Sequence, residues 1–498
     1  MNTKKIALVI NLILLLALVL SACSSPAATT PPATTEAPAT TEAVVPTTAT
    51  EATVAPTESP LPVVLKLPEQ IAGGRPVAIT VAGAPPDSQP TLAANYQAGI
   101  DRFEALYPNV TIRPDSYTYD PATFAAMVAG NTVPTLFQAY FTDPAKMVSD
   151  GVAADLTPIF DSLGLKDVYN PQVLDLVTVD GKIYGIPMKA YAMGLAYNKT
   201  MLKAAGFDNP PTTWEELATM AKALTNRDTG VAGFSFIFGD PVQAGWHTSI
   251  LSFDFGVKNT DLVNMVDGKL VASFDNQPML DTLNMIHDLR WVSDVLPREN
   301  NDWGKNGDAL ATGKEAMALM ASDQFTWMKQ NYPDIDMSQF GFAPLPAVNG
   351  TSVSQVGGDV AMVSATATSD QIEAAAYYRL WLQLDPNEID ITYKLSASDP
   401  TVVIGGPTMP LYTGDYQAAK AALDTKYSNL PVDYALFQEG IVSGKTQVML
   451  EPGFGEGQDF YAALGPVVST IVTDEKADIP ALLKEAQNTF QVNVLDLK

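Results

Sequence analysis

The stretch 180–217, DGKIYGIPMKAYAMGLAYNKTMLKAAGFDNPPTTWEEL, carries the signals that decide the fold. Its first half predicts two short strands, KIYGIP and MGLAYN, on either side of a loop that holds Lys189, Tyr191 and Met193. Two helices are predicted next, and Thr213 is placed to cap the second of them. We therefore expect the chain to leave one strand–helix layer here and enter another, with polar and aromatic side chains at the crossing.

The residues before this stretch alternate between strand and helix patterns. Strands are predicted at 75–83, 110–114 and 135–141, and helices at 94–108, 123–130 and 143–151. Such alternation with short turns is typical of an open, mostly parallel α/β sheet. Because ligands bind beyond the carboxyl ends of the strands in these sheets, the loop 84–90 and the turn 140–143 are expected at a binding edge.

The residues after the stretch predict a second α/β region. Strand patterns occur at 231–239, 340–347 and 356–365, and helix patterns at 244–256, 278–296, 369–384, 459–472 and 479–495. The segment 405–412, GGPTMPLY, is expected to cross between regions again. About 420 residues follow the N-terminal segment, which exceeds one ordinary domain and favours two lobes.

Several motifs in this order resemble extracellular solute-binding proteins of family 1, the maltose-binding-like receptors of ABC importers. The motifs are F-x-x-x-YP-NVT, dGk-YGiP, L-YNK, TTWeEL, tGKeAMalM, PLPa and the GGD strand, spread over residues 76–495. Two positions depart from the family pattern: Pro134-Thr135 replaces a Pro-Asp pair, and Ala321-Ser322-Asp323 stands where many members carry a stacking aromatic residue. The departures affect which ligand is expected and leave the class unchanged.

The resemblance implies a fold of the α/β class with two lobes, a type II periplasmic-binding-protein-like fold whose ligand cleft lies between lobes joined by a hinge. We expect lobe I to comprise 66–192 and 357–404, and lobe II 193–356 and 405–498. It also implies delivery of the captured solute to ABC permease subunits in the membrane. We expect the receptor to act as a monomer.

The first residues predict export. A basic start, an apolar run over 6–20 and the ending L-S-A-C give a lipoprotein signal peptide over 1–22, with Cys23 as the lipidated residue. Residues 23–65, rich in Thr, Pro and Ala, predict a disordered tether. The protein is then an extracytoplasmic lipoprotein at the outer face of the cell membrane or in the periplasm. Since Cys23 is the single cysteine of 498 residues, the mature fold has no disulfide.

Composition and motifs favour binding over catalysis. The formal net charge of −26 argues against nucleic acid and anionic membrane surfaces as partners. The two histidines lie in apolar helical patterns, and the sequence contains no HExxH, CxxC or GxSxG motif. We therefore predict no catalytic residue, no cofactor and no metal ligand. A glycoside-active enzyme stays open as an alternative, because a carboxylate pair can be assembled from 55 acidic residues.

Sugars present apolar ring faces and rims of hydroxyls, so a sugar site needs aromatic rings beside carboxylates and amides. The predicted ligand-binding residues are Tyr140, Phe141, Asp143, Tyr191, Trp246, Asp323, Trp327, Asp359 and, in the tail, Phe454 and Phe460. Tyr191 matches a ligand-contacting position of the family, and Trp246 a region where many members place a stacking ring. The expected cargo is a sugar or oligosaccharide; a polyamine or a glycerol phosphate is the alternative.

Overall fold

The computed structural model describes residues 61–348, 350–399, 402–406 and 408–497. The predicted signal peptide, the lipidated Cys23 and most of the predicted tether lie outside the described residues. The last residues of that tether are part of the folded body, contrary to the prediction. Leu61 and Leu65 are buried in the hydrophobic core, 4% and 6% exposed, because both are large apolar side chains that pack against it.

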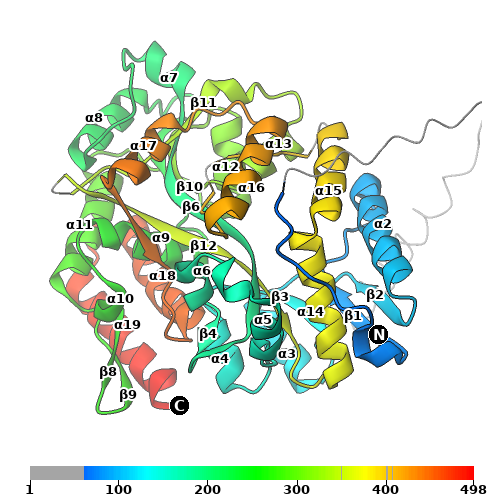
Figure 1. Ribbon diagram of the computed structural model, residues 1–498. Helices are drawn as coiled ribbons and strands as arrows, with labels where there is room; N and C mark the ends of the chain where they lie inside the picture. Colours follow the sequence, from blue (N-terminus) through cyan, green and yellow to red (C-terminus); the bar gives the residue numbers. More distant parts are fainter. Residues whose placement is uncertain (1–60, 349, 400–401, 407, 498) are drawn as a thin grey trace, which may run out of the picture. The chain divides into compact units, whose positions relative to one another are not determined.

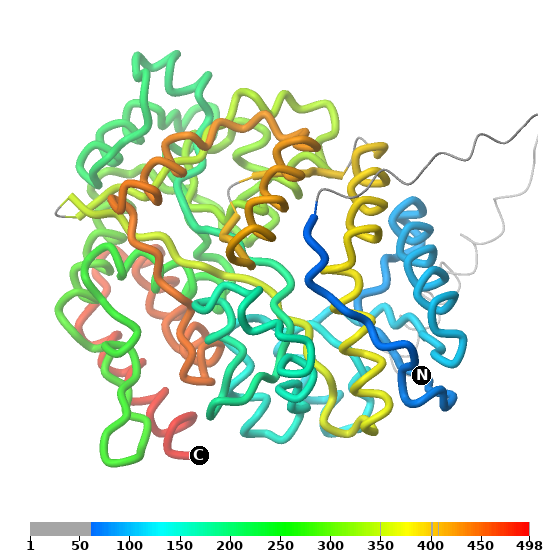
Figure 2. The backbone as a smooth tube through the Cα atoms, in the orientation of Figure 1, coloured from blue at the N-terminus to red at the C-terminus, as the bar shows by residue number. Residues whose placement is uncertain are grey.

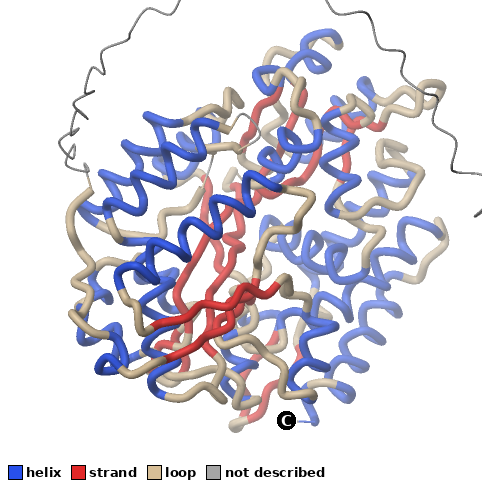
Figure 3. Tube along the Cα trace, turned by 90° about the vertical axis from the view of Figure 1, so that its right-hand side faces the viewer, coloured by secondary structure: helices blue, strands red, loops and turns tan. Residues whose placement is uncertain are grey.

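One mixed sheet of nine strands runs through the body (Figures 1 and 3). The strand order is β2-β1-β3-β12-β6-β10-β7, with β11 paired to β6 and β13 paired to β12. The bounds are β1 Val77–Ala82, β2 Val110–Asp115, β3 Leu136–Tyr140, β6 Gly185–Asn198, β7 Ala232–Ser235, β10 Glu315–Ala321, β11 Phe340–Ala343, β12 Ser352–Val363 and β13 Thr446–Leu450. Two short hairpins, β4–β5 (Thr178–Val179, Lys182–Ile183) and β8–β9 (Val263–Val266, Lys269–Ala272), lie outside it.

The sheet is less parallel than the alternating pattern predicts. β1 pairs in parallel with β2 and β3, and β10 with β7. The central pairs β3–β12, β12–β6 and β6–β10 are antiparallel. Parallel pairs therefore lie toward both ends of the strand order, and β13 adds another on β12, whereas the central pairs where the chain passes between the two regions are antiparallel.

β6 is one continuous strand of 14 residues, so the loop predicted around Lys189, Tyr191 and Met193 is wrong. Lys189 and Tyr191 pair with β12, and Met193 pairs with β10. Because β12 runs beside this part of β6, Pro187 and the polar Lys189 do not interrupt the strand.

Helices cover both faces of the sheet (Figure 3). The helices before β6 are α2 Pro90–Leu106, α3 Pro121–Ala129, α4 Pro144–Ser149, α5 Thr157–Leu163 and α6 Pro171–Asp175. Those between β6 and β12 are α7 Lys199–Ala204, α8 Trp214–Leu224, α9 Pro241–Asp254, α10 Asn259–Leu262, α11 Gln277–Trp291, α12 Trp303–Ala311 and α13 Gln324–Asn331. After β12 come α14 Ser369–Leu384, α15 Pro386–Ser398, α16 Gly414–Tyr427, α17 Ala435–Ser443, α18 Gly457–Thr473 and α19 Ile479–Asn493. Among the described residues, none of these helices combines the length and the apolar character needed to cross a membrane.

The predicted cap Thr213 is present, and Asp240, which was not predicted, caps a second helix. Thr213 accepts a hydrogen bond from Glu216 N at the start of α8, and Asp240 accepts one from Gln243 N at the start of α9. The caps fix where α9 begins, and thereby where Trp246 lies one turn later.

The buried side chains form two large clusters. The first includes Phe103, Tyr169 and Trp381, and the second includes Phe234, Phe274 and Phe460. β6 and β12 contribute to both: Ile186 belongs to the first cluster and Leu195 to the second. A third, smaller cluster packs around β11, α13 and α17.

The tail packs differently from the expected lobe assignment of 405–498. Tyr412, Tyr416 and Leu423 belong to the first cluster, because the Tyr412 ring packs against Tyr169, 5.2 Å between ring centroids. The segment 405–412 lies beside β6, where Met409 N donates to Ala190 O at 3.3 Å. After α16, Leu430 packs in the third cluster. Figure 2 shows the backbone of this tail, orange to red, from α16 to the C-terminus.

Candidate ligand-binding site

Polar side chains gather on one face of the sheet where β6 and β12 pass between the two clusters. Tyr191 pairs with Gly357 across the two strands, and Lys189 pairs with Asp359. Asp359 in turn pairs with Tyr140 at the end of β3. Because every second residue of a strand points to the same face, and cross-strand partners share a face, these side chains lie together. We call Tyr140, Lys189, Tyr191, Gln355, Asp359 and Glu451 the crossing face.

Gly357 gives the Tyr191 ring its place on this face. A Cβ atom on Gly357 would lie 2.2 Å from Tyr191 Cε2, so the ring lies directly over the glycine backbone. On the opposite face the Phe141 ring covers Gly358 in the same way, since a Cβ atom on Gly358 would lie 2.5 Å from Phe141 Cε2. The pair of glycines therefore lets one aromatic ring lie on each side of β12.

Side chains of the second cluster cover the crossing face. The Trp246 ring meets the Tyr191 ring edge to face, with 6.2 Å between centroids, and Trp246 Nε1 donates to Gln355 Oε1 at 2.9 Å. Lys189 Nζ donates to Asp323 Oδ2 at 2.6 Å and lies 5.9 Å from the Tyr191 ring centre. The predicted residues Tyr140, Tyr191, Trp246, Asp323 and Asp359 are thus brought together.

The remaining predicted residues are not on the crossing face, although Phe141 lines the cavity described below and the charge of Asp143 acts on Glu451. Phe141 and Phe460 are buried in the first and second clusters, 1% and 0% exposed, and Phe454 packs on Phe460. Asp143 turns back on its own strand and accepts from Tyr140 N and Thr142 Oγ1. The Trp327 ring packs against Trp303, 5.7 Å between centroids.

Two residues of the crossing face were missed. Gln355 could have been found from the alternation of 355, 357 and 359 in β12. Glu451 follows β13, a strand that the sequence pattern did not predict. No feature of the sequence therefore pointed to Glu451 as a site residue. Glu451 comes directly after Leu450, which pairs with Val356 next to Gly357.

Burial and clustered charge shift the titration of this face. Burial raises the pKa of Glu451 well above its ordinary value, and the charges of Asp143 and Asp359 add to the shift. Burial also raises the pKa of Asp359, where Lys189 opposes the shift, and raises that of Tyr140 to about 12. The face is therefore rich in carboxylates and poor in positive charge.

Several buried polar atoms around this face have no hydrogen-bond partner among the described residues: Gln355 Nε2, Glu451 Oε2, Asp323 Oδ1 and Asn259 Oδ1. A buried polar atom without a partner is costly, and water, an ion or a bound molecule usually satisfies it. Further such atoms lie elsewhere in the described residues, Tyr169 Oη and Glu315 Oε2 among them, so these four make the crossing face a candidate site.

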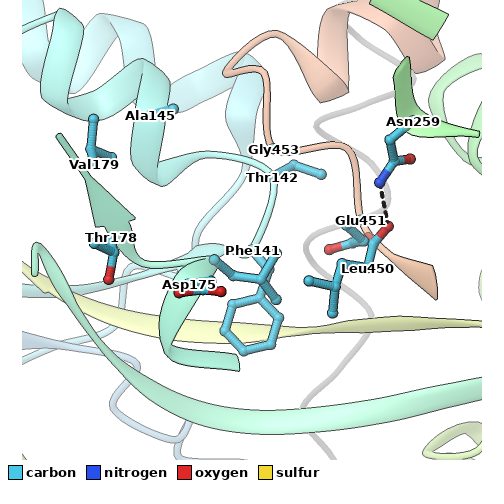
Figure 4. A pocket seen from close by; sticks show the side chains of 11 residues that line it. Phe141, Thr142, Ala145, Asp175, Thr178, Val179, Asn259, Leu450, Glu451 and Gly453 are labelled. Carbon is cyan, nitrogen blue, oxygen red and sulfur yellow. Dashed lines mark hydrogen bonds between the residues drawn. The ribbon is translucent and has the colours of Figure 1, made fainter. Parts of the chain in front are cut away.

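A cavity of about 240 Å³ adjoins the face at Glu451 (Figure 4). Thr142, Asp175 and Thr178 line it on one side, and Asn259, Leu450 and Gly453 on the other. Asn259 Nδ2 donates to Leu450 O at 3.0 Å, which leaves Asn259 Oδ1 without a partner among the described residues.

The described residues contain no group of three or more His, Cys, Asp or Glu side chains placed to hold a metal ion. His247 is fully buried in the helix α9, where burial lowers its pKa to about 3 and Nδ1 accepts from Ile237 N. His247 therefore stays neutral, and its Nδ1 atom satisfies the backbone N–H of Ile237.

Comparison with known proteins identifies the family. The family model described as "Bacterial extracellular solute-binding protein" matches residues 98–394, more than half of the chain. The chain therefore belongs to the bacterial extracellular solute-binding proteins, which confirms the resemblance and an extracytoplasmic location. A curated relative from Pyrococcus horikoshii, an uncharacterized ABC transporter extracellular-binding protein, is 26% identical over 275 residues. That match covers 51% of this chain and 57% of the relative, so the chain spans little more than half of the relative's length.

Solved structures share the fold. An ABC transporter solute-binding protein from Thermotoga lettingae, bound with α-D-tagatose, superposes with a TM-score of 0.64 at 18% identity, covering 83% of this chain and 98% of its own. UgpB from Mycobacterium tuberculosis, in complex with glycerophosphocholine, gives a TM-score of 0.63 at 18% identity, covering 84% and 98%. These similarities confirm the predicted two-lobe periplasmic-binding-protein fold.

Proposed function

We propose that the protein is an extracytoplasmic receptor that captures a sugar or oligosaccharide between its two lobes and delivers it to the permease of an ABC transporter. The observation that carries the proposal is the Tyr191–Trp246 ring pair among buried polar atoms without partners in the described part of the chain. The proposed binding residues are Tyr140, Tyr191, Trp246, Asp323 and Asp359.

The chemistry of the crossing face suits a sugar. Aromatic rings offer surfaces for apolar ring faces, while carboxylate oxygens accept from hydroxyls and the Gln355 amide donates to them. A hydroxyl donates and accepts at once, so a molecule with several hydroxyls can satisfy all of the unpaired atoms. The tagatose-bound structure of the same fold supports this class of ligand.

The contacts between the clusters support capture by closure. Gln458 Nε2 at the start of α18 donates to Thr142 Oγ1 at the end of β3, 2.9 Å apart. This hydrogen bond and the Lys189–Asp323 ion pair hold the two sides of the site against each other. Hinge closure around a ligand is a common route to capture in two-lobe receptors.

The relative from Pyrococcus horikoshii supports an ABC transporter as the partner. The proposal includes anchoring through lipid on Cys23 after removal of residues 1–22, and a monomeric receptor without catalytic activity. Metabolic labelling with a radioactive fatty acid tests the anchor: label is expected on the intact chain and absent from Cys23→Ser. Turnover of chromogenic glycosides by the purified protein would count against the absence of activity.

A thermal-shift screen of residues 24–498 against sugars, polyamines and phosphate esters tests the ligand class. A ligand at about 100 times its Kd stabilises the fold by about 2.7 kcal/mol, enough to raise the Tm by a few degrees. A shift with sugars supports the proposal. Shifts confined to polyamines or phosphate esters would keep the fold and replace the cargo with the alternative class.

Replacing Tyr191 and Trp246 by Ala tests the site. The double variant is expected to lose more than about tenfold in affinity, since it removes both rings from the crossing face. Trp291→Ala is the control, because that ring lies on α11 and donates to Ile471 O, away from the crossing face. Affinity within about twofold of wild type in the double variant would show that the site is elsewhere.

A further inference from the structure

We propose that Glu451 determines specificity: it receives a ligand group that donates hydrogen bonds and carries no negative charge, either a hydroxyl or an ammonium group. The inference rests on the proposed function and names the chemistry that the site selects. Glu451 is not among the residues predicted from the sequence, and of the described cavity lining Phe141 is the one predicted ligand-binding residue.

The position of Glu451 places it between the crossing face and the cavity. It follows β13, so it lies next to Gly357, over which the Tyr191 ring is placed. Its charge acts on Tyr191, Tyr140 and Tyr461, which places all three rings near the carboxylate. It also lines the cavity of Figure 4.

The carboxylate is buried without being satisfied. Glu451 is 4% exposed, and its Oε2 atom has no hydrogen-bond partner among the described residues. Asn259 Oδ1, on the wall of the same cavity, is a second buried acceptor in the same condition. Both residues line the cavity, so a molecule bound there can supply donors to these acceptors.

The cavity lining offers an anion no partner. Asp175 is the other acidic residue in the described lining, which contains no Lys, Arg or His. Burial and the nearby Asp143 and Asp359 raise the pKa of Glu451, so this group holds its proton more tightly than an exposed glutamate. A carboxylate or phosphate placed here would be buried with no cation of the described lining to offset the cost of desolvation.

Gln355 adds a donor to the two acceptors. The indole N–H of Trp246 can only donate, so the amide oxygen of Gln355 must face it, and the amide nitrogen points away. That nitrogen has no partner in the described part of the chain. A hydroxyl can accept from Gln355 while donating to Glu451, whereas an ammonium group can satisfy only the acceptors.

The test uses residues 24–498 and matched probes: glucose, glucosamine and glucuronate, with spermidine and glycerol 3-phosphate beside them. Glucosamine and glucuronate each differ from glucose at one carbon, so calorimetric titration of the three compares hydroxyl, ammonium and carboxylate groups. We expect binding of glucose or glucosamine and at least roughly 100-fold weaker binding of both anions. Whichever of glucose and glucosamine binds more tightly identifies the donor group that the site takes, hydroxyl or ammonium.

Glu451→Gln is expected to weaken the tightest probe by roughly tenfold or more, with the larger loss for a cation. Asp161→Asn is the control, an exposed carboxylate on α5 outside the described cavity lining, and it should leave affinity within about twofold. Circular dichroism melting shows whether Glu451→Gln is folded; the selectivity of the wild type against glucuronate tests the inference without any variant.

The outcomes separate the two proposals. Tight binding of glucuronate or glycerol 3-phosphate, or unchanged sugar affinity in Glu451→Gln, overturns the role of Glu451 and leaves a sugar receptor. Binding of spermidine without either sugar overturns sugar as the cargo and supports the role of Glu451. A wild type that binds none of the five probes and no sugar of the wider screen overturns the proposed function and this inference with it.

Discussion

At the scale of single residues, Gly357 controls the position of the ring most central to the site. A Gly357→Ala side chain would meet Tyr191 Cε2 at 2.2 Å, so the ring must move. We expect ligand affinity to fall roughly tenfold or more and the free energy of unfolding to fall by about 1–3 kcal/mol. Titration calorimetry and urea denaturation measure both.

Gly304→Ala is the matched control for this substitution. Its Cβ would meet no atom closer than 3.5 Å, so it fits at ordinary contact distance. Equal effects of the two substitutions would contradict the account of the Tyr191 ring.

Glu315 makes stability depend on pH. It is 3% exposed on β10, and burial raises its pKa to about 8 from 4.5. The folded protein therefore keeps a proton that the unfolded chain loses, and stability falls as the pH rises from about 4.5 to about 8, by up to roughly 1.4 kcal/mol per unit. Glu315→Gln should remove this loss.

The measurement compares urea denaturation of the wild type and Glu315→Gln at pH 5, 6.5 and 8 (about the window of the shift). The difference between the two proteins isolates Glu315 from His247, whose lowered pKa gives the opposite slope below pH 6.5 in both. Parallel curves would show that Glu315 does not hold a proton.

Sequence reasoning located part of the site at this scale. Tyr191 and Trp246 carry motif and stacking signals, and the structure places them in contact. Phe460 also looked like a platform, because a helical aromatic near a cleft and one facing the core have the same local pattern. Burial of Phe460 among Phe274 and Phe490 depends on distant contacts that no local pattern contains.

At the scale of elements, α9 and α18 approach each other through glycines. A Cβ on Gly465 would lie 1.9 Å from Pro241 O, and one on Gly245 would lie 2.0 Å from Tyr461 O. Trp246 follows Gly245 directly, so the spacing of the two helices fixes where its ring meets Tyr191.

Gly465→Ala should push the helices apart, because the clash is with rigid backbone. We expect a loss of at least about 2 kcal/mol in unfolding free energy, together with weaker ligand binding. Gly99→Ala in α2 is the control, since its nearest atom is 3.8 Å away; there a helical alanine should stabilise by about 0.5–1 kcal/mol. A neutral Gly465→Ala would contradict the close packing.

The helices and strands with strong periodicity were predictable, and those shaped by their neighbours were not. β1, α14 and α18 carry clear apolar patterns and were expected at nearly their observed bounds. β6 looked interrupted, since Lys189 and Tyr191 are polar or half-polar where a buried strand is usually apolar. Polar residues within a buried strand are typical of a functional position, and it is there that the local pattern failed.

At the scale of the whole molecule, ligand binding should change the separation of the two lobes. Small-angle scattering with and without the tightest sugar of the screen should show a smaller radius of gyration in the bound form. The Tyr191→Ala/Trp246→Ala variant should show no change at the same sugar concentration. An unchanged radius in the wild type, despite calorimetric binding, would contradict capture by closure.

The two-lobe fold was predictable from motif order, whereas the path of the tail was not. Tyr412, Tyr416 and Leu423 return to the first cluster because their rings and side chains meet Tyr169 and its neighbours. Such long-range packing has no local signature, and a Gly-Pro segment such as 405–412 reads equally as a turn or as a crossing.

The adjacency of β6 and β12 has a kinetic consequence. Because the strands are paired with each other across the crossing, both can bend together while their mutual hydrogen bonds remain intact. Opening then need not wait for strands to separate, and it falls in the microsecond-to-millisecond range of collective domain motion. The dwell time of the cargo would be set by the contacts of the site itself, so substitutions that weaken affinity should act on the dissociation rate and leave the association rate nearly unchanged.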